Sequence, residues 1–256
     1  MFENIYFFFQ PIIQISKDFF KIFFLKIRKK RQFYENGKLK SLVSYRCKIL
    51  DGLYEEYWRN GNKRISCQYK DGKIDKSLKT YFENGTLNTE EIYLYHDIYT
   101  WKGNLSFKDF FQNHMFYFDS SLKKKGKYNK IRKEYDNDGF LRKIEYLKDQ
   151  KLHGTSIQYY KNGSIQKETE YLHNLKNGCE KIYYENGILQ KKSFYLNNLR
   201  FGNVITYFNN GRISNESSFK NDKLNGSFIT YNVNGDVLTK KNYINSCEVT
   251  IIDIHN

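Results

Sequence analysis

The sequence predicts an all-β protein, an elongated antiparallel meander of about nine β-hairpin repeats of 24 residues, preceded by a short N-terminal helical segment. Three observations lead to this prediction: a glycine that recurs every 24 residues, an asparagine before nearly every one of these glycines, and an aromatic-rich composition without alanine. Asn-Gly between β-favouring runs is the strongest short-range indication of a hairpin. A regular series of such pairs therefore predicts a regular series of hairpins.

The composition supports a folded sheet protein. The 256 residues are 39% hydrophobic and 18% aromatic, which is enough apolar surface for a sizeable core. Tyrosine occurs 23 times, phenylalanine 21 times and proline once. Aromatic residues favour strands, whereas alanine, the best helix former, is missing.

The chain is strongly basic, with 43 Lys and Arg against 28 Asp and Glu and a net charge of +15. This balance would suit a nucleic acid, an anionic membrane or an acidic protein. The basic residues are spread along the repeats, however, and a nucleic-acid site would be expected to gather them in one stripe. We therefore expect no nucleic-acid partner, and the only dense basic cluster is Lys26 to Arg31.

The four cysteines, Cys47, Cys67, Cys179 and Cys247, are far apart in the sequence. They form no CxxC pair and no Cys-His spacing of the kind that zinc needs. They are typical of ordinary thiols in a reducing compartment. The predicted location is the cytoplasm, with or without association to a membrane.

Residues 1–31 form a separate N-terminal segment, apolar and aromatic at first and then basic. A secretory signal peptide is disfavoured because the charge follows the apolar run, and a full membrane span is disfavoured by Lys17, Asp18 and Lys21. Two hypotheses stay open: a helix that caps the first strand of the array, or an interfacial helix on an anionic membrane. The candidate membrane contacts are Phe19, Phe20, Phe23, Phe24, Lys26, Arg28, Lys29, Lys30 and Arg31.

The repeat array is predicted over residues 32–246, followed by a C-terminal capping strand or tail at 247–256. The residue four before the glycine column is aromatic in all nine copies. One copy, within residues 93–133, is degenerate, and His114 takes the glycine place there. A second glycine, nine residues before the first in five copies, predicts a second turn in each repeat.

The predicted turn residues are Asn36, Gly37, Asn60, Gly61, Asn84, Gly85, Asn162, Gly163, Asn186, Gly187, Asn210, Gly211, Asn234 and Gly235. We expect two-residue type I′ turns, which need positive φ at both central positions. With Asn186 and Gly187 as such a turn, Tyr184 lies opposite Leu189 in an apolar cross-strand pair. Tyr183 and Tyr195 then point to opposite faces, so both faces receive aromatic side chains.

This pattern, aromatic-aromatic-x-Asn-Gly-x-Leu at a 24-residue period, resembles the MORN-repeat variant family, which includes YwqK-type antitoxin-like proteins. The best matching stretches are YYENGIL at 183, QYYKNGSI at 158, TYFENGTL at 80 and QFYENGKL at 32. The resemblance implies a β-hairpin array that serves as a binding or scaffold surface without a catalytic motif. It also implies either neutralisation of a partner toxin or a membrane-proximal scaffolding role.

The residues indicate no catalytic, metal or cofactor site. The five histidines occupy unrelated places in the repeats, and no phosphate-binding glycine loop or calcium loop occurs. The protein is therefore predicted not to be an enzyme. Specific binding is expected where the repeat is irregular, and the candidate partner-binding residues are Trp101, Phe110, Phe111, His114, Phe116, Tyr117 and Phe118.

The functional prediction is a non-enzymatic repeat protein that binds another protein, with an antitoxin or immunity-like role taken from the family resemblance. The alternative is a membrane-apposed scaffold anchored by residues 1–31. The first hypothesis requires a protein partner, and the second requires an anionic membrane surface.

Overall fold

The computed structural model describes residues 27–94 and 129–249. Within these two ranges every regular element is a β-strand, and the strands form 19 elements in two compact units. This confirms the antiparallel β-meander for the described residues. The expected N-terminal helix falls mainly on residues 1–26, which lie outside the described part of the chain.

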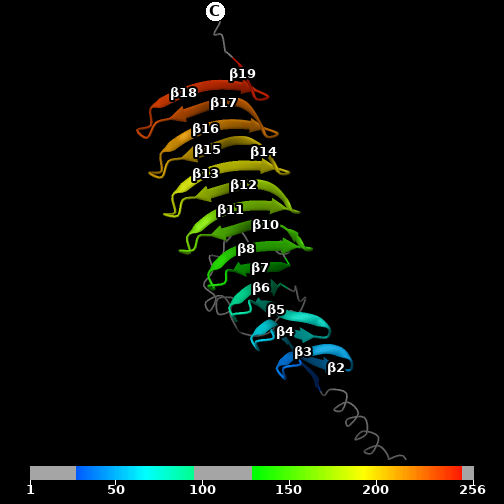
Figure 1. The fold of residues 1–256 in the computed structure, drawn as a ribbon. Coiled ribbons are helices and arrows are strands. Elements are labelled where there is room, and N and C mark those ends of the chain that lie inside the picture. The colour runs from blue at the N-terminus through cyan, green and yellow to red at the C-terminus, as the bar shows by residue number, and fades with distance from the viewer. Residues whose placement is uncertain (1–26, 95–128, 250–256) are drawn as a thin grey trace, which may run out of the picture. The chain divides into compact units, whose positions relative to one another are not determined.

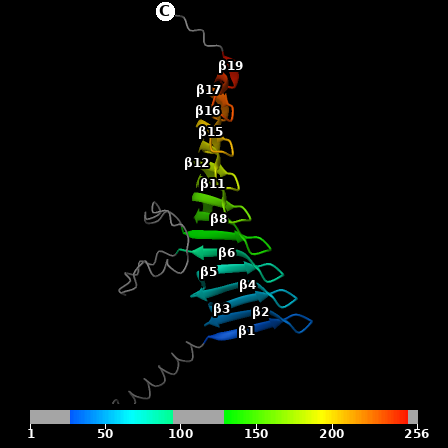
Figure 2. The ribbon, with the colours of Figure 1, turned by 90° about the vertical axis from the view of Figure 1, so that its left-hand side faces the viewer.

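Unit 1 is a six-stranded meander in which each strand pairs antiparallel with the next. Figure 2 shows these strands stacked in chain order from β1 to β6. The strands are β1 (Arg28–Phe33), β2 (Leu39–Arg46), β3 (Ile49–Tyr57), β4 (Lys63–Lys70), β5 (Lys73–Tyr81) and β6 (Leu87–Tyr93).

Unit 2 continues the same plan, and Figure 1 shows its turns alternating between two edges of the sheet. Its strands are β7 (Lys130–Tyr135), β8 (Leu141–Lys148), β9 (Lys151–Leu152), β10 (Gly154–Tyr159), β11 (Ile165–Leu172), β12 (Leu175–Tyr183), β13 (Leu189–Leu196), β14 (Leu199–Arg200), β15 (Gly202–Tyr207), β16 (Ile213–Lys220), β17 (Lys223–Tyr231), β18 (Val237–Ile244) and β19 (Cys247–Val249). A one-residue break separates the short strand β9 from β10, and another separates β14 from β15.

The Asn-Gly turns have a different geometry from the predicted type I′ turn. The amide of Gly187 donates to the carbonyl of Tyr184 (2.9 Å), and the amide of Tyr184 donates to the carbonyl of Ile188 (2.8 Å). Gly187 has a φ of 86°, whereas Asn186 lies outside the positive-φ region. The loop is therefore a type I turn followed by one left-handed glycine, a three-residue connection.

The extra loop residue changes the register that the sequence predicted. Tyr183, not Tyr184, lies opposite Leu189, and Ile182 lies opposite Lys191, so Gln190 forms a bulge. The predicted Tyr184–Leu189 pair was wrong, because a three-residue loop shifts the pairing relative to a two-residue loop. Beyond the bulge, alternation places Tyr183 and Tyr195 on opposite faces, as predicted.

Two-residue type I′ turns do occur, but at the opposite edge of each unit. Asn197 (φ 50°) and Asn198 (φ 72°) join β13 to β14, and Leu196 pairs with Leu199 across this turn. The same two positions have positive φ in the other described turns of this edge. We call this edge the type I′ edge and the other the Asn-Gly edge.

The second glycine of the repeat marks a bulge and not a turn. Gly178 lies inside β12 with a φ of 120°, where the pairing with β11 jumps from Thr169 opposite Glu180 to Tyr171 opposite Lys176. A Cβ on Gly178 would lie 3.0 Å from the Cβ of Glu170. The close backbone approach explains the glycine.

The two faces of unit 2 follow from the strand register. Glu180, Ser193 and Tyr195 lie on one side, which we call the Ser193 face, and Phe194 and Leu196 lie on the other, the Phe194 face. Ser193 is fully buried, and Thr169 and Ser217 in the same repeat position are 3% and 6% exposed. Small side chains therefore fill the centre of the Ser193 face.

Candidate interaction surface

Most of the predicted partner and membrane contacts lie outside the described residues. All seven candidate partner-binding residues fall within 95–128, and Phe19, Phe20, Phe23, Phe24 and Lys26 precede residue 27. The remaining candidates, Arg28 to Arg31, belong to β1 and are exposed along the whole strand. They are therefore part of the first hairpin and not of an N-terminal helical segment.

The predicted turn asparagines link successive repeats. The side-chain oxygen of Asn186 accepts a hydrogen bond from the amide of Ile188 (3.0 Å), and its Nδ2 donates to Oδ1 of Asn209 (2.6 Å) in the next repeat. In unit 1, Asn60 caps the amide of Asn62 (2.9 Å) and donates to the carbonyl of Glu83 (2.7 Å). Asparagine is suited to this place because its amide both accepts and donates.

Aromatic side chains form a second link between repeats at the same edge. The phenol of Tyr160 donates to the carbonyl of Tyr183 (2.7 Å), and the phenol of Tyr184 donates to the carbonyl of Tyr207 (2.9 Å). In unit 1 the indole Nε1 of Trp58 makes the same contact with the carbonyl of Tyr81 (3.1 Å). These residues occupy the column three before the glycine. Tyrosine and tryptophan can donate a hydrogen bond from this column, whereas phenylalanine has no donor.

The type I′ edge carries a third link. The amide of Asn198 donates to the carbonyl of Lys176 (2.9 Å), and its side-chain oxygen accepts from the amide of Lys176 (2.7 Å). Asn174 makes the equivalent pair of contacts with Leu152. These hydrogen bonds involve backbone groups of the turns. Successive repeats are therefore hydrogen-bonded to one another at both edges of unit 2.

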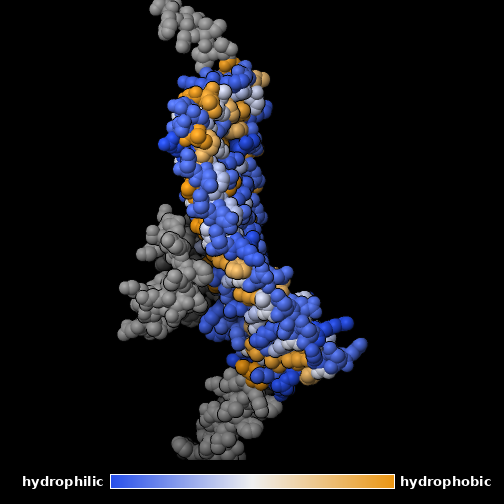
Figure 3. Space-filling model, turned by 60° about the vertical axis from the view of Figure 1, so that its left-hand side comes forward, coloured by the Kyte–Doolittle hydropathy of each residue, from blue (hydrophilic) through white to orange (hydrophobic). Residues whose placement is uncertain are grey.

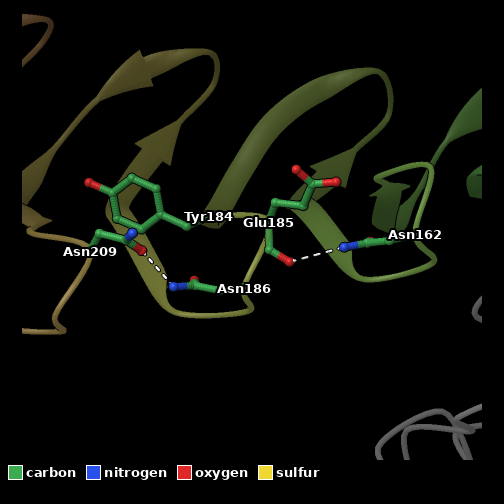
Figure 4. Close-up of a pocket in the computed structure, with 5 residues that line it drawn as sticks. All are labelled: Asn162, Tyr184, Glu185, Asn186 and Asn209. Atoms are coloured by element: carbon green, nitrogen blue, oxygen red, sulfur yellow. Dashed lines mark hydrogen bonds between the residues drawn. The ribbon is translucent and has the colours of Figure 1, made fainter.

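A shallow recess lies among the Asn-Gly turns of unit 2 (Figure 4). It is lined by Asn162, Tyr184, Glu185, Asn186 and Asn209. Its amides already donate within the array, with Asn162 bonded to the carbonyl of Glu185 (3.3 Å) as well as the Asn186–Asn209 contact. This arrangement is explained by the stacking of hairpins, so the recess does not provide a separate site for chemistry.

The Ser193 face contains a buried carboxylate with several partners. Glu180 is 4% exposed, and its carboxylate lies 2.8 Å from Nζ of Lys176 and 3.0 Å from Nζ of Lys167. It also accepts from the hydroxyls of Thr169 (3.1 Å) and Tyr195 (3.2 Å). Three neighbouring strands, β11, β12 and β13, thus bring one acid together with two bases.

The electrostatics of Glu180 indicate a structural ion cluster. Burial acts to raise the pKa of this carboxyl, but hydrogen bonds from Lys176 and Lys167 outweigh it and hold the pKa below its ordinary value of 4.5. A carboxylate that stays ionised between two lysines is poorly suited to act as a general base near neutral pH. In unit 1, the pKa of Glu55 is lowered in the same way, against its burial, by Lys63 and Tyr57.

The Phe194 face has a different character along the type I′ edge. Four successive turns are flanked by cross-strand pairs of one residue type each: Lys148–Lys151, Leu172–Leu175, Leu196–Leu199 and Lys220–Lys223. We call the four leucines the Leu strip; their exposed fractions are 42%, 39%, 51% and 43%. Phe194 (39%) and Phe201 (49%) lie beside it.

A further exposed apolar group lies at the end of unit 2. Val233, Val237 and Leu238 are 55%, 57% and 63% exposed. Figure 3 shows hydrophobic side chains gathered over these last strands.

Columns that are uniform from repeat to repeat do not reveal the Leu strip. The strip occupies two columns that change between repeats, visible as KDQK, LHNL, LNNL and KNDK. Within the described residues no group of three or more His, Cys, Asp or Glu side chains could hold a metal ion. The described part of the chain also contains no helix long and apolar enough to cross a membrane.

Comparison with known families agrees with the hairpin geometry. The sequence model of the MORN repeat variant matches residues 29–46, 50–71, 152–173 and 176–197. These four segments are MORN-variant repeats. Each spans a hairpin closed by an Asn-Gly turn and extends toward the next type I′ turn. The match identifies the MORN-variant repeat, while the YwqK-type subgroup stays a prediction.

No curated protein matches the chain. Among solved structures, the crystal structure of TcdB2-TccC3-Cdc42 is 16% identical with a TM-score of 0.24, over 84% of this chain. The crystal structures of TcdB2-TccC3-TEV and of TcdB2-TccC3 without its hypervariable C-terminal region are each 12% identical, with TM-scores of 0.24 and 0.22 over 85% and 84% of this chain. This chain spans 12% to 14% of those chains.

Proposed function

We propose that this protein is a non-enzymatic interaction protein whose array of MORN-variant repeats binds another protein. The proposal is based on a difference between the uniform and the variable repeat columns. Uniform columns link one hairpin to the next, as the Asn186–Asn209 and Tyr184–Tyr207 contacts do. The variable columns of the Leu strip place apolar side chains at the surface, where protein partners bind.

The finer role follows from the family resemblance and not from the site. An antitoxin or immunity-like protein would hold a toxin on such a surface and block it. The four cysteines are far apart in the sequence and form no CxxC pair, which is compatible with binding in the cytoplasm. The partner in this proposal is a single folded protein that forms a stoichiometric complex.

Affinity purification of the full chain from its source cell tests the proposal. We expect one co-purifying protein in stoichiometric amount, and the complex should re-form when both proteins are purified separately and mixed in a calorimeter. If that protein is a toxin, growth of cells that express it should be restored by this chain. A chain that purifies alone under gentle conditions would contradict the proposal, and so would a co-purifying protein that gives no heat of binding when mixed with the purified chain.

The second candidate function is a membrane-apposed scaffold. The observation in its favour is the exposed basic strand β1, in which Arg28 to Arg31 present four consecutive cations. Such a cluster would attract anionic lipid by about 1 kcal/mol per basic residue near the surface. The array would then project from the membrane into the cytoplasm.

Vesicle sedimentation with the full chain tests this second candidate. Removing residues 1–31 is a poor experiment, because it would also delete four residues of β1 and expose β2. We instead compare the chain with a variant in which Arg28, Lys29, Lys30 and Arg31 become Gln. A matched control replaces four exposed lysines elsewhere, Lys48, Lys70, Lys73 and Lys240. Equal sedimentation of both variants with phosphatidylserine vesicles would contradict the scaffold function.

A further inference from the structure

The order of residue pairs along the type I′ edge of unit 2 is the starting observation. On the Phe194 face, successive turns present a lysine pair, two leucine pairs and a second lysine pair. The leucine pairs are Leu172–Leu175 and Leu196–Leu199, and the flanking pairs are Lys148–Lys151 and Lys220–Lys223. An apolar surface two repeats wide therefore lies between two cationic groups.

Folding does not require leucine in the Leu strip. The same two columns hold lysine in the two flanking repeats, whose hairpins have the same turns and the same pairing. All four leucines are exposed by 39% to 51%, so they contribute little to a core. Exposed apolar side chains that the fold does not need indicate a contact surface.

The backbone at this edge is already occupied. The turn amides of Asn174, Asn198 and Asp222 donate to the carbonyls of Leu152, Lys176 and Arg200 in the preceding repeat, at 2.9, 2.9 and 3.1 Å. A partner that adds a β-strand needs unpaired backbone groups along an edge. Recognition at the type I′ edge must therefore use side chains.

The repeat spacing matches the rise of about two turns of an α-helix. Each repeat contributes two strands at about 4.8 Å, so successive turns are about 10 Å apart. Seven residues of an α-helix rise about 10.5 Å, at 1.5 Å per residue. A helix lying along the edge can therefore present one residue in every seven to each successive turn.

We propose that the Leu strip binds an acidic amphipathic α-helix of a protein partner. Two apolar residues seven apart meet the two leucine pairs, and acidic residues seven before and seven after them meet the lysine pairs. The proposal rests on the protein-binding function proposed above and names the surface and the chemistry of the partner. Helix-in-groove recognition through regularly spaced anchors is a common mode of peptide binding.

The charge pattern favours a protein helix over a membrane. The turn inside each flanking lysine pair also carries an acid, Asp149 in one and Asp222 in the other. Asp222 lies 2.8 Å from Nε of Arg200. Asp222 is therefore already neutralised, whereas Asp149 would repel a continuous anionic lipid surface. Single acidic side chains of a helix can approach the lysines alone.

A synthetic peptide tests the proposal with the full chain. The probe is a helical peptide of about 22 residues with leucines seven apart in the middle and a glutamate seven residues beyond each leucine, on one face. We expect saturable binding in fluorescence anisotropy at low salt. A peptide of the same composition with the leucines nine residues apart should bind at least about tenfold more weakly, because its second anchor misses the next turn.

Variants of the chain make the test specific. Leu196→Lys with Leu199→Lys copies the pair found in the neighbouring repeats, so the variant should fold, and it should weaken peptide binding by about tenfold or more. Ile244→Lys is the matched control, since Ile244 occupies the same column as Leu196 one turn beyond the second lysine pair and is 58% exposed. It should leave binding unchanged. Lys220→Glu with Lys223→Glu should weaken the acidic peptide and favour one with lysine at that end.

Failure of this proposal can be told apart from failure of the proposed function. If the chain binds a protein partner equally well with and without the two Leu→Lys changes, the Leu strip is overturned while the protein-binding function stands. If the peptide does not bind but anionic vesicles bind and the Leu→Lys variant loses them, the occupant is a membrane and the proposal is overturned. Binding of the peptide that is unaffected by the Leu→Lys changes also overturns it.

Discussion

The phenol of Tyr184 donates a hydrogen bond of 2.9 Å to the backbone carbonyl of Tyr207, 23 residues later. The contact joins the Asn-Gly edge of one repeat to the same edge of the next. Tyr34, Trp58 and Tyr160 make the equivalent contact in their own repeats. A carbonyl at the end of a strand is thereby satisfied by a neighbouring hairpin, which makes each repeat depend on the next.

Tyr184→Phe should destabilise the array. The change removes one hydrogen bond and leaves the carbonyl of Tyr207 without this donor, so we expect a loss of roughly 0.5–1.5 kcal/mol in the free energy of unfolding. Urea denaturation followed by circular dichroism measures the change. Phe208 holds the same column in the next repeat, and Phe208→Tyr should raise stability by a similar amount by reaching the carbonyl of Tyr231. Equal stability of all three chains would show that the link contributes nothing.

Asn186→Ala should cost more than Asn186→Asp. Alanine removes both the cap on the amide of Ile188 and the link to Asn209, whereas aspartate keeps the acceptor and loses only the donor. We expect a loss of about 1–2 kcal/mol for alanine and a smaller one for aspartate. Thermal unfolding of the three chains provides the measurement. Had the turn been type I′, the main requirement would be positive φ, and Asn186→Gly would be tolerated; here it should also destabilise.

Glu180→Gln should lower stability at neutral pH and change its pH dependence. The pKa of Glu180 lies below 4.5, because Lys176 and Lys167 outweigh the effect of burial. A lowered carboxyl pKa contributes stability that is present above the unfolded pKa and is lost as the pH falls through the folded pKa. The wild type should therefore lose this contribution below pH 4.5, while the variant has already lost it, roughly 1–3 kcal/mol, at pH 7.

The control for this prediction is Glu185→Gln, since Glu185 is exposed on an Asn-Gly turn of the same unit. Its stability curve between pH 3 and 7, measured by urea denaturation, should follow the wild type. If Glu180→Gln also follows the wild type across that range, the ion cluster with Lys167 and Lys176 has no net effect on folding.

Lys76→Gly should stabilise unit 1. Lys76 occupies the column of the second glycine, where it adopts a φ of 68° inside β5. A left-handed conformation costs a residue with a Cβ roughly 1–2 kcal/mol, and glycine avoids this strain. We expect a gain of about 1 kcal/mol in the unfolding free energy. Lys76→Ala keeps the Cβ and serves as the comparison; if alanine stabilises as much as glycine, removal of the lysine side chain and not backbone strain is responsible.

Sequence periodicity predicted the strands well, because alternation and turn residues are local properties. The 24-residue glycine column and the aromatic column locate the described Asn-Gly hairpins. Turn type was assigned to the wrong edge, since Asn-Gly suits both a type I′ turn and a type I turn followed by a left-handed glycine. In the folded protein the Asn186 side chain forms hydrogen bonds with Ile188 and Asn209, which accompany the type I geometry of this turn.

The candidate surface was less predictable than the fold. The Leu strip consists of Leu172, Leu175, Leu196 and Leu199. The two repeat columns that hold these leucines, one before and one after the turn, contain other residues in other repeats. Their common face follows from the pairing of β11 with β12 and of β13 with β14. The prediction that the irregular repeat at residues 93–133 binds a partner stays a prediction. Residues 95–128 of this repeat lie outside the described structure.

The sequence by itself determined that this protein is an array of hairpins, with strands of known position and turns of known residues. Tertiary structure decided how the hairpins are joined, because Tyr184 and Tyr207, or Asn186 and Asn209, become neighbours only when successive repeats stack. It also decided the face on which side chains lie near each Asn-Gly turn, since the bulge at Gln190 places Leu189 and Lys191 on opposite faces, where a simple period of two would place them on one. The exposure of the four leucines of the Leu strip is likewise a property of the folded protein.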